Sequence, residues 1–369
     1  RGRTGSGKTV AFSVPLVAAL ARGSRSAPRR PRGLVLVPTR ELAAQVAEVL
    51  GPLAAAVGLR VATVFGGVGQ GPQVAGLRRG VDVVVACPGR LEDLVGQGHC
   101  SLDAVEVTVV DEADHMADLG FLPVVRRLLD RTPAGTQRLL FSATLDNGID
   151  VLVRRYLRDP VTHSVDSEAV PLVAMAHHVL TVSTADKAAV VRELAAGRRR
   201  SLLFTRTKHG ARKLARNLSA SGIPAGELHS NLSQTVRARN LAAFGDGSTL
   251  VLVATDIAAR GIHVDDIGLV VHVDPPAEHK AYLHRSGRTA RAGADGVVVS
   301  LATPDQRGEV QSIARKAGIR PATASVAPGD ARIAALVGPP ASLVRARPPL
   351  DRPAPTARAG RGRPRRSLA

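Results

Sequence analysis

Residues 2–9 read G-R-T-G-S-G-K-T and match the pattern G-x-x-x-x-G-K-[ST]. Glycines let the backbone curl so that its N–H groups face phosphate oxygens, and a helix that begins after this loop points its positive end at the same anion. Lys8 can reach the β- and γ-phosphates of a nucleotide, and the Thr9 hydroxyl can ligate Mg²⁺. The stretch therefore predicts a phosphate-binding loop made of Thr4, Gly5, Ser6, Gly7, Lys8 and Thr9. The alternative is a glycine-rich turn before a helix.

A second stretch, V-T-V-V-D-E-A-D at residues 107–114, supplies the carboxylates that such a loop requires. Its apolar half predicts a buried strand that delivers Asp111 to the carboxyl edge of a sheet, where this residue can hold Mg²⁺ through water. Glu112 is placed to orient or deprotonate the attacking water. The alternative is an acidic turn in which Asp114 caps the following helix. Together, the two stretches favour a site that binds ATP with Mg²⁺ and hydrolyses it.

Short apolar runs alternate with amphipathic stretches along most of the chain, which favours two successive α/β units. Buried parallel strands are expected at residues 34–37, 81–86, 107–110, 139–141, 202–204, 250–254, 269–273 and 297–301. Helical patterns lie between them, at residues 41–50 and from His209, Gln234 and Ala277 onward. The expected domains are residues 1–160 and 175–322, joined by a linker at 161–174 and followed by a disordered Arg/Pro-rich tail at 323–369.

Composition and charge limit the classes of function. The net charge of +19 and the isoelectric point of about 11.4 favour a polyanionic partner such as nucleic acid. The excess of Arg over Lys also fits a GC-rich genome, so charge alone leaves the partner open. Cys87 and Cys100 form neither a disulfide framework nor a zinc-type spacing, which favours a reducing cytoplasm. No apolar run reaches the roughly 18 residues of a membrane helix, so no membrane span is expected.

Residues 111–114 spell D-E-A-D, and the chain resembles the DEAD-box family of ATP-dependent RNA helicases in superfamily 2, of bacterial type. Further motifs follow in the family's order over roughly residues 1–305. They are P-T-R-E-L-A at 38–43, G-G at 66–67, P-G-R at 88–90, S-A-T at 142–144, L-F-T-R at 203–206, Q-x-x-R at 234–237, A-T-D-I-A-A-R-G at 254–261 and H-R-S-G-R-T-A-R at 284–291. A DEAH-type helicase would carry His at Asp114 and usually Gln at His284, so both positions favour the DEAD-box family.

The resemblance implies an α/β protein of two tandem RecA-like parallel-sheet domains that close on ATP. The residues that it implies for catalysis are Lys8, Asp111, Glu112, His284, Arg288 and Arg291. Arg288 and Arg291 would act as arginine fingers on the γ-phosphate, and His284 would touch that phosphate or the S-A-T motif. Ser142 and Thr144 would couple hydrolysis to domain closure.

The resemblance also implies that RNA lies across both domains, held through its phosphates and sugars. The implied contacts are Pro38, Thr39, Arg40, Gly66, Gly67, Gly89 and Arg90 in the first domain and Thr205, Gln234, Arg237 and Thr255 in the second. Because only 2% of the residues are aromatic, base stacking should be minor and binding independent of sequence. We expect a monomeric enzyme that unwinds short RNA duplexes or remodels RNA–protein complexes.

Departures from the family pattern bear on activity. Cys87 stands where Thr usually precedes P-G-R, and a thiol is a weak donor toward phosphate. His263 stands where the family usually has Asp near the ATP ribose. The chain begins at Arg1 rather than Met, and we expect the adenine-binding Q motif and the strand before the phosphate loop to lie outside it. The alternative function is therefore a nucleic-acid-binding protein with weak or no ATPase activity.

Overall fold

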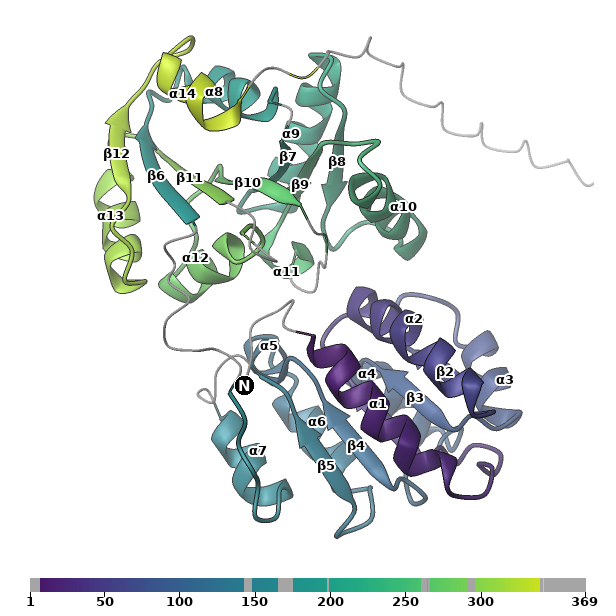
Figure 1. The fold of residues 1–369 in the computed structure, drawn as a ribbon. Helices are drawn as coiled ribbons and strands as arrows, with labels where there is room; N and C mark the ends of the chain where they lie inside the picture. Colours follow the sequence, from purple (N-terminus) through teal and green to yellow (C-terminus); the bar gives the residue numbers. More distant parts are fainter. Residues whose placement is uncertain are drawn as a thin grey trace, which may run out of the picture.

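The computed structural model describes residues 7–142, 148–164, 175–197, 199–259, 264, 266–290, 296–338 and 341. These residues form two α/β domains, each built on one parallel sheet with helices on both faces (Figure 1). None of the helices in these ranges combines the length and hydropathy that crossing a membrane requires.

The first domain contains, among its described residues, a five-stranded sheet in the order β2-β3-β1-β4-β5. Its strands are β1 Gly33–Leu36, β2 Val61–Val64, β3 Val83–Ala86, β4 Val107–Val110 and β5 Gln137–Leu140. Its helices are α1 Lys8–Ala21, α2 Arg40–Ala56, α3 Gly71–Arg78, α4 Pro88–Gly96, α5 Ala113–Asp118, α6 Leu122–Leu129 and α7 Ile149–Tyr156. All neighbouring strands are parallel, so their carboxyl ends meet at one edge.

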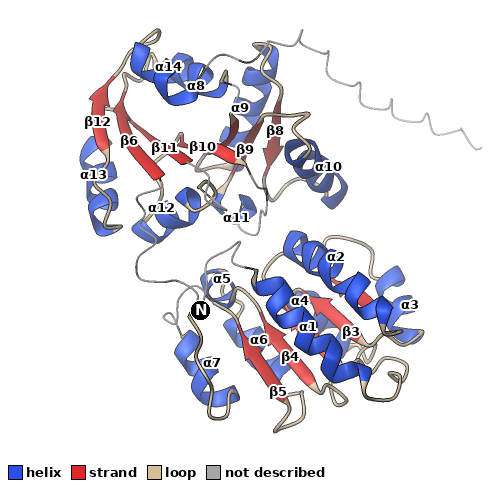
Figure 2. Cartoon of the chain, in the orientation of Figure 1, coloured by secondary structure: helices blue, strands red, loops and turns tan. Residues whose placement is uncertain are grey.

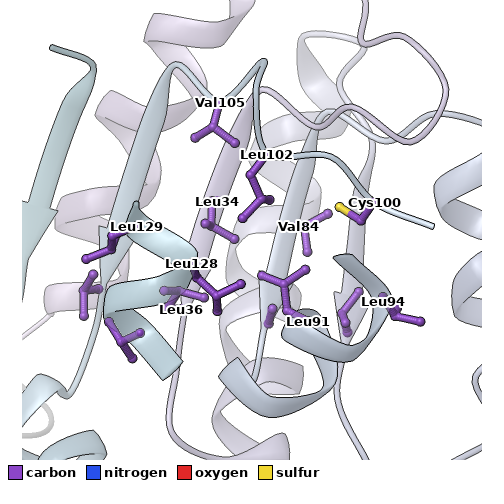
Figure 3. Packing of buried hydrophobic residues seen from close by; sticks show 14 of the residues in the cluster. Leu34, Leu36, Val84, Leu91, Leu94, Cys100, Leu102, Val105, Leu128 and Leu129 are labelled. Carbon is purple, nitrogen blue, oxygen red and sulfur yellow. The ribbon is translucent and has the colours of Figure 1, made fainter. Parts of the chain in front are cut away.

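Two hydrophobic cores enclose this sheet because side chains of successive strand residues point to opposite faces. Val35 of β1 lies in one core with Phe12 of α1. Its neighbour Leu34 lies in the other core with Leu91 of α4 and Leu128 of α6 (Figure 3). A strand that is covered on both faces needs an apolar residue at nearly every position, and this explains the continuous apolar runs of β1, β3 and β4.

The second domain contains a seven-stranded sheet among its described residues, in the order β12-β6-β11-β10-β7-β9-β8. Its strands are β6 Met175–Thr181, β7 Arg200–Phe204, β8 Ala225–Leu228, β9 Val251–Ala254, β10 Ile267–His272, β11 Gly296–Ala302 and β12 Ala322–Ser325. Its helices are α8 Lys187–Ala195, α9 Lys208–Ala220, α10 Gln234–Gly245, α11 Asp256–Ala259, α12 His279–Ser286, α13 Arg307–Lys316 and α14 Ala331–Val337. Helices α8, α9 and α14 share one core with Leu203, and α10 and α11 share the other with Leu202.

The second domain ends later in the chain than the sequence predicts. β12 pairs with β6, and Ile333 and Val337 of α14 join the core that α8 lines, so residues 322–337 belong to this domain rather than to a tail that starts at 323. The sequence pattern also missed β2, β6 and β8. Residues 161–164 of the expected linker have neither helix nor strand, whereas 165–174 and 342–369 lie outside the described residues.

The two domains face each other through the carboxyl edges of their sheets. The starts of α1 and α2 together with α5 lie opposite α10, α11 and α12 (Figures 1 and 2). Among the described residues, two ion pairs cross the gap: Arg237 Nε lies 2.8 Å from Glu41 Oε1, and His284 Nδ1 lies 3.7 Å from Asp118 Oδ2. Motif residues from both halves of the chain are thus collected around one gap.

Candidate nucleotide site and nucleic-acid interface

The described part of the phosphate-binding loop lies at a helix N-terminus. Gly7 precedes α1 with a left-handed backbone (φ 79°) that glycine adopts without steric penalty, and Lys8 and Thr9 open the helix. α1 starts on the side of the first domain that faces the second (Figure 1). The N–H groups of its first turn and its dipole therefore point toward the gap. Thr4, Gly5 and Ser6 lie outside the described residues.

Asp111 and Glu112 follow β4 at the carboxyl edge, and both are buried. Burial, helped by the neighbouring Glu112 carboxylate, raises the pKa of Asp111 to about 7, while the positive charge of Lys8 acts in the opposite direction. Glu112 has a left-handed backbone (φ 48°), which costs a non-glycine residue about 1–3 kcal/mol. Strain of this kind concentrates at functional sites.

The donor set at this edge fits Mg²⁺. Mg²⁺ takes oxygen ligands, keeps several waters and typically uses one or two protein carboxylates beside substrate phosphates. Burial, followed by the charge of Glu112, raises the pKa of Asp111, and Lys8 offsets this rise only in part. A divalent cation would relieve that charge, and the Thr9 hydroxyl at the start of α1 supplies a second oxygen.

Ser142 joins the end of β5 to the D-E-A-D turn. Its hydroxyl accepts a hydrogen bond from the Asp114 N–H at 3.2 Å, and the Ala113 N–H donates to the Phe141 carbonyl at 3.1 Å. Ser142 is only 1% exposed, so its hydroxyl is committed to this contact. A shift of either segment is therefore transmitted to the other. Thr144 lies outside the described residues.

Helix α12 and the turn after it carry His284 and Arg288, and His284 contacts the first domain. His284 lies beside Asp118 of α5, and Arg288 is 8% exposed with its Nε donating to the His284 carbonyl at 3.3 Å. His284, Arg285 and Arg288 also line one small pocket in this region. Arg291 lies outside the described residues, so the structure does not describe its position.

Arg285 anchors this helix, although the sequence did not single it out. Its Nε and Nη2 donate to the two carboxylate oxygens of Asp256 at 2.5 and 2.7 Å, and its Nη1 donates to the Asp274 carbonyl at 2.8 Å. The guanidinium carbon also lies 5.1 Å from the centre of the Phe204 ring. Arg285 therefore ties α12 to α11 and to the end of β10, and positions the functional residues on either side of it.

In the first domain, the expected RNA contacts follow the carboxyl ends of β1, β2 and β3. The Thr39 hydroxyl accepts a hydrogen bond from the first turn of α2 at 3.2 Å and so caps that helix. Arg40 lies against Gly67, whose left-handed backbone (φ 75°) favours glycine. Arg90 Nη1 donates to the Val68 carbonyl at 3.2 Å. The same edge carries Pro38, Gly66 and Gly89.

Gln234 and Arg237, at the start of α10, contact the first domain. Arg237 Nε donates to Glu41 Oε1 at 2.8 Å, and Gln234 Nε2 donates to the same oxygen at 3.3 Å. Arg40 Nη1 donates to Gln234 Oε1 at 3.3 Å. Burial acts to raise the pKa of Glu41, but the hydrogen bond and charge of Arg237 outweigh burial and lower it. Both residues, expected at RNA, are thus engaged with protein groups.

Thr205 is turned inward, contrary to its expected contact with RNA. It is 3% exposed, and its hydroxyl donates to the Thr207 carbonyl at 3.2 Å. The cause is its strand-like position, since the Thr205 N–H donates to the Ala254 carbonyl and continues the β7–β9 ladder. Arg206 beside it is exposed. Thr255 is half-buried.

Other residues near the site were not indicated by sequence alone. His115 Nδ1 lies 3.1 Å from Glu112 Oε2, and both side chains are buried, so His115 fixes the direction of that carboxylate. Cys87 precedes α4, and burial raises the pKa of its thiol to about 12, which keeps it neutral. His263 lies outside the described residues. Glu41, Asp118 and Asp256 are further partners that only the fold reveals.

A cavity of about 1020 Å³ lies elsewhere, along the outer edge of β5. Its lining includes residues 137–141 and 155–161 but none of Lys8, Asp111, Glu112 and Arg288. The volume of this cavity therefore does not identify the functional site, whereas the positions of the charged motif residues do. The shared gap holds the convergent charged groups, and we place the candidate site there.

Comparison with known proteins shows which family the chain resembles. The DEAD/DEAH box helicase family model matches residues 1–151, and the helicase conserved C-terminal domain model matches residues 186–293. The ATP-dependent RNA helicase RhlB of Pseudomonas syringae pv. tomato is 38% identical over 86% of this chain and 82% of that protein. DEAD-box ATP-dependent RNA helicase 5 of Oryza sativa subsp. japonica is 37% identical over 85% of this chain, which spans 64% of that protein's length.

A solved structure is similar as well. The structure of Saccharomyces cerevisiae Dbp5 bound to RNA and ADP BeF3 matches with a TM-score of 0.77 and 26% identity. The match covers 91% of this chain and 88% of Dbp5. The similarity thus extends over both domains.

Proposed function

The chain belongs to the family of DEAD-box ATP-dependent RNA helicases, and we propose that it uses ATP hydrolysis to separate short RNA duplexes or to remodel RNA–protein complexes. One observation carries the proposal. Asp111 and Glu112 of the first domain and His284 and Arg288 of the second lie at facing edges, across a gap that the contact between Asp118 and His284 spans.

The first domain would bind the nucleotide phosphates. Lys8 and the N–H groups at the start of α1 attract the phosphate chain, because both present positive charge toward the gap. Asp111 and Thr9 would hold Mg²⁺, partly through water, and Mg²⁺ when bound neutralises phosphate charge. Glu112, held by His115, would accept a proton from the attacking water or orient it.

The second domain would complete the site on closure. Arg288, with Arg291, would stabilise charge on the γ-phosphoryl group as it leaves, an effect typically worth about 10³–10⁵ in rate. His284 would sense closure through Asp118. Ser142, with Thr144, would relay changes at the D-E-A-D turn to β5.

RNA would lie along the carboxyl edges of both sheets. The proposed contacts in the first domain are Pro38, Thr39, Arg40, Gly66, Gly67, Gly89 and Arg90, and those in the second are Thr255 with Gln234 and Arg237. Support comes from Dbp5, whose structure contains RNA and ADP BeF3. Such groups bind phosphate and sugar rather than bases, so binding independent of sequence follows.

A non-catalytic nucleic-acid-binding protein is the less favoured function. Lys8, Asp111, Glu112 and Arg288 would have no reason to gather at one gap in a protein that only binds RNA. ATP-dependent separation of a short RNA duplex tests the proposal, with Glu112→Gln as the inactive control. We expect separation that requires ATP and intact Glu112. Processive unwinding of long DNA duplexes would contradict the proposal, as would duplex separation by Glu112→Gln at the parental rate.

A further inference from the structure

Helix α9 presents a basic face that none of the family motifs includes. The helix reads K-H-G-A-R-K-L-A-R-N-L-S-A over Lys208–Ala220 and contains no acidic residue. Lys208, Arg212, Lys213 and Arg216 are all exposed. The opposite face carries Ala211 and other small or aliphatic residues that pack into the core of the second domain.

The cationic residues form a continuous stripe. Lys208, Arg212 and Arg216 are spaced four residues apart, so they lie one above the other on a helix, and Lys213 lies beside them. At about 1.5 Å per residue the stripe is about 12 Å long. Like charges at this spacing repel each other and weaken a helix. The stripe therefore contributes nothing to the stability of α9 itself.

Within the described residues, three of these cations lack the carboxylate partners that several exposed arginines elsewhere have. Arg30 pairs with Asp103 at 2.9 Å, Arg127 with Glu92 at 2.6 Å, Arg154 with Asp150 at 2.5 Å, Arg155 with Asp130 at 3.0 Å and Arg332 with Asp330 at 2.6 Å. Within the part of the chain that the structure describes, Arg212, Lys213 and Arg216 make no ion pair, and Lys208 Nζ donates to the neutral amide oxygen of Asn231 at 3.2 Å. What sets this face apart is that its cations lie side by side on a helix without an acidic residue.

The stripe starts at the proposed RNA edge. α9 follows β7, so its first residues lie at the carboxyl edge of the sheet, where Thr207 caps the helix by accepting a hydrogen bond from the Gly210 N–H at 3.0 Å. Lys208 is tied there to Asn231, which closely precedes Gln234 of α10. The rest of the helix returns along the sheet, away from the first domain. An anionic strand that leaves the gap at this point would meet Arg212, Lys213 and Arg216 in turn.

We propose that the exposed face of α9 binds the phosphates of single-stranded RNA that extends beyond the gap between the domains. The inference rests on the proposed function, because RNA must first occupy the gap. Unpaired Lys and Arg side chains on one face suit a phosphate backbone, and the absence of aromatic residues from α9 argues against base stacking. The face would thereby raise the affinity for long RNA above that for RNA just long enough to fill the gap.

The test compares two triple variants of equal charge change in the same domain. Arg212→Gln/Lys213→Gln/Arg216→Gln removes the stripe, and Arg307→Gln/Arg315→Gln/Lys316→Gln removes three exposed cations from α13 as a control. Affinity for a short oligouridylate that fills only the gap and for one about three times longer is measured over a range of salt concentrations. Thermal unfolding confirms that both variants fold.

We expect the stripe variant to lose its preference for the longer RNA and its salt slope to fall by about 0.7 for each lost phosphate contact, or about 2 in all. Its affinity for the short RNA and its ATP turnover on that RNA should remain parental, and the α13 variant should keep the preference. An unchanged slope on long RNA, or an equal loss in both variants, would overturn the inference. Failure of the proposed function would appear separately, as no stimulation of the parental ATP turnover by the short RNA.

Discussion

The buried pair between Arg285 and Asp256 shows how single residues hold the second half of the site together. Arg285 is 2% exposed, so its positive charge is stabilised by the Asp256 carboxylate and the Asp274 carbonyl rather than by water. A buried cation that loses its partner keeps the full cost of its desolvation. The pair therefore helps to place His284 on the same helix and Arg288 just after its end.

Asp256→Asn should destabilise the second domain. Asparagine keeps the shape but removes the charge that balances Arg285, and breaking a buried pair costs about 3 kcal/mol or more. Urea unfolding would measure the loss. Asp330→Asn, at the exposed pair with Arg332, is the matched control and should change stability little. Equal and small effects of both substitutions would show that the pair with Arg285 is not structural.

Sequence motifs predicted the charged residues of the site better than the residues with which they form hydrogen bonds and ion pairs. Lys8, Asp111 and Glu112 stand out because phosphate and Mg²⁺ chemistry demands those residue types at that spacing. The contact between Arg237 and Glu41 joins residues 196 positions apart, and no local pattern signals such a pairing. The inward direction of the Thr205 hydroxyl could not be predicted for the same reason, since the register of β7 decides which way that hydroxyl points.

At the scale of elements, helix α12 rests on a buried polar cluster. The Tyr282 hydroxyl of α12 lies 2.9 Å from His177 Nδ1 on β6. Its ring packs edge-on against His272 of β10 at 4.9 Å, and His272 Nδ1 lies 3.0 Å from Ser300 Oγ on β11. Burial lowers the pKa of His177 to about 4, and burial together with the nearby Arg285 charge lowers the pKa of His272 well below its usual value. Both imidazoles are therefore neutral under α12.

This cluster predicts a loss of stability in mild acid. Between about pH 6.5 and pH 4 the histidines of the unfolded chain bind protons, whereas the buried imidazoles of the folded chain stay neutral. The free energy of unfolding therefore rises with pH in that window and falls as the pH is lowered. Each such histidine contributes up to about 1.4 kcal/mol per pH unit. Urea unfolding at several pH values measures the slope, which should be shallower in His272→Asn. The exposed His209→Asn is the control, and equal slopes in the two variants would contradict the prediction.

The sequence predicted every central strand except β6, and β5 was the one edge strand of the described sheets that it predicted. β1, β3, β4 and β9 are covered on both faces and read as apolar runs. β2, β8 and β12 lie at sheet edges and are half-exposed, so A-G-E-L at residues 225–228 and A-T-A-S at 322–325 carry no apolar signal. Only pairing with a neighbouring strand makes such segments β-structure.

At the scale of the whole molecule, the start of α2 meets the start of α10 through Glu41, Arg237, Gln234 and Arg40. Arg237 and Glu41 are both largely buried, so the pair is shielded from solvent. This contact couples the relative position of the domains to the edge where RNA is proposed to bind. Closure and RNA binding should therefore support each other.

A double-mutant cycle separates a protein-contact role of Arg237 from a direct phosphate contact. Glu41→Gln and Arg237→Gln should each weaken RNA binding in the presence of a non-hydrolysable ATP analogue, and the double variant should be little worse than either. Titration of labelled single-stranded RNA measures the affinities, with the exposed Glu48→Gln on the same helix as control. Parental affinity in Glu41→Gln beside a large loss in Arg237→Gln would instead assign Arg237 to RNA alone.

The central claim is that the two domains form one RNA-dependent ATPase site. ATP turnover by this chain at saturating ATP, with and without single-stranded RNA, measures that dependence directly. We expect RNA to stimulate turnover and Glu112→Gln to lower it by about 10²-fold or more, because that substitution removes the group that activates water. Equal turnover with and without RNA, or turnover that survives Glu112→Gln, would contradict the claim.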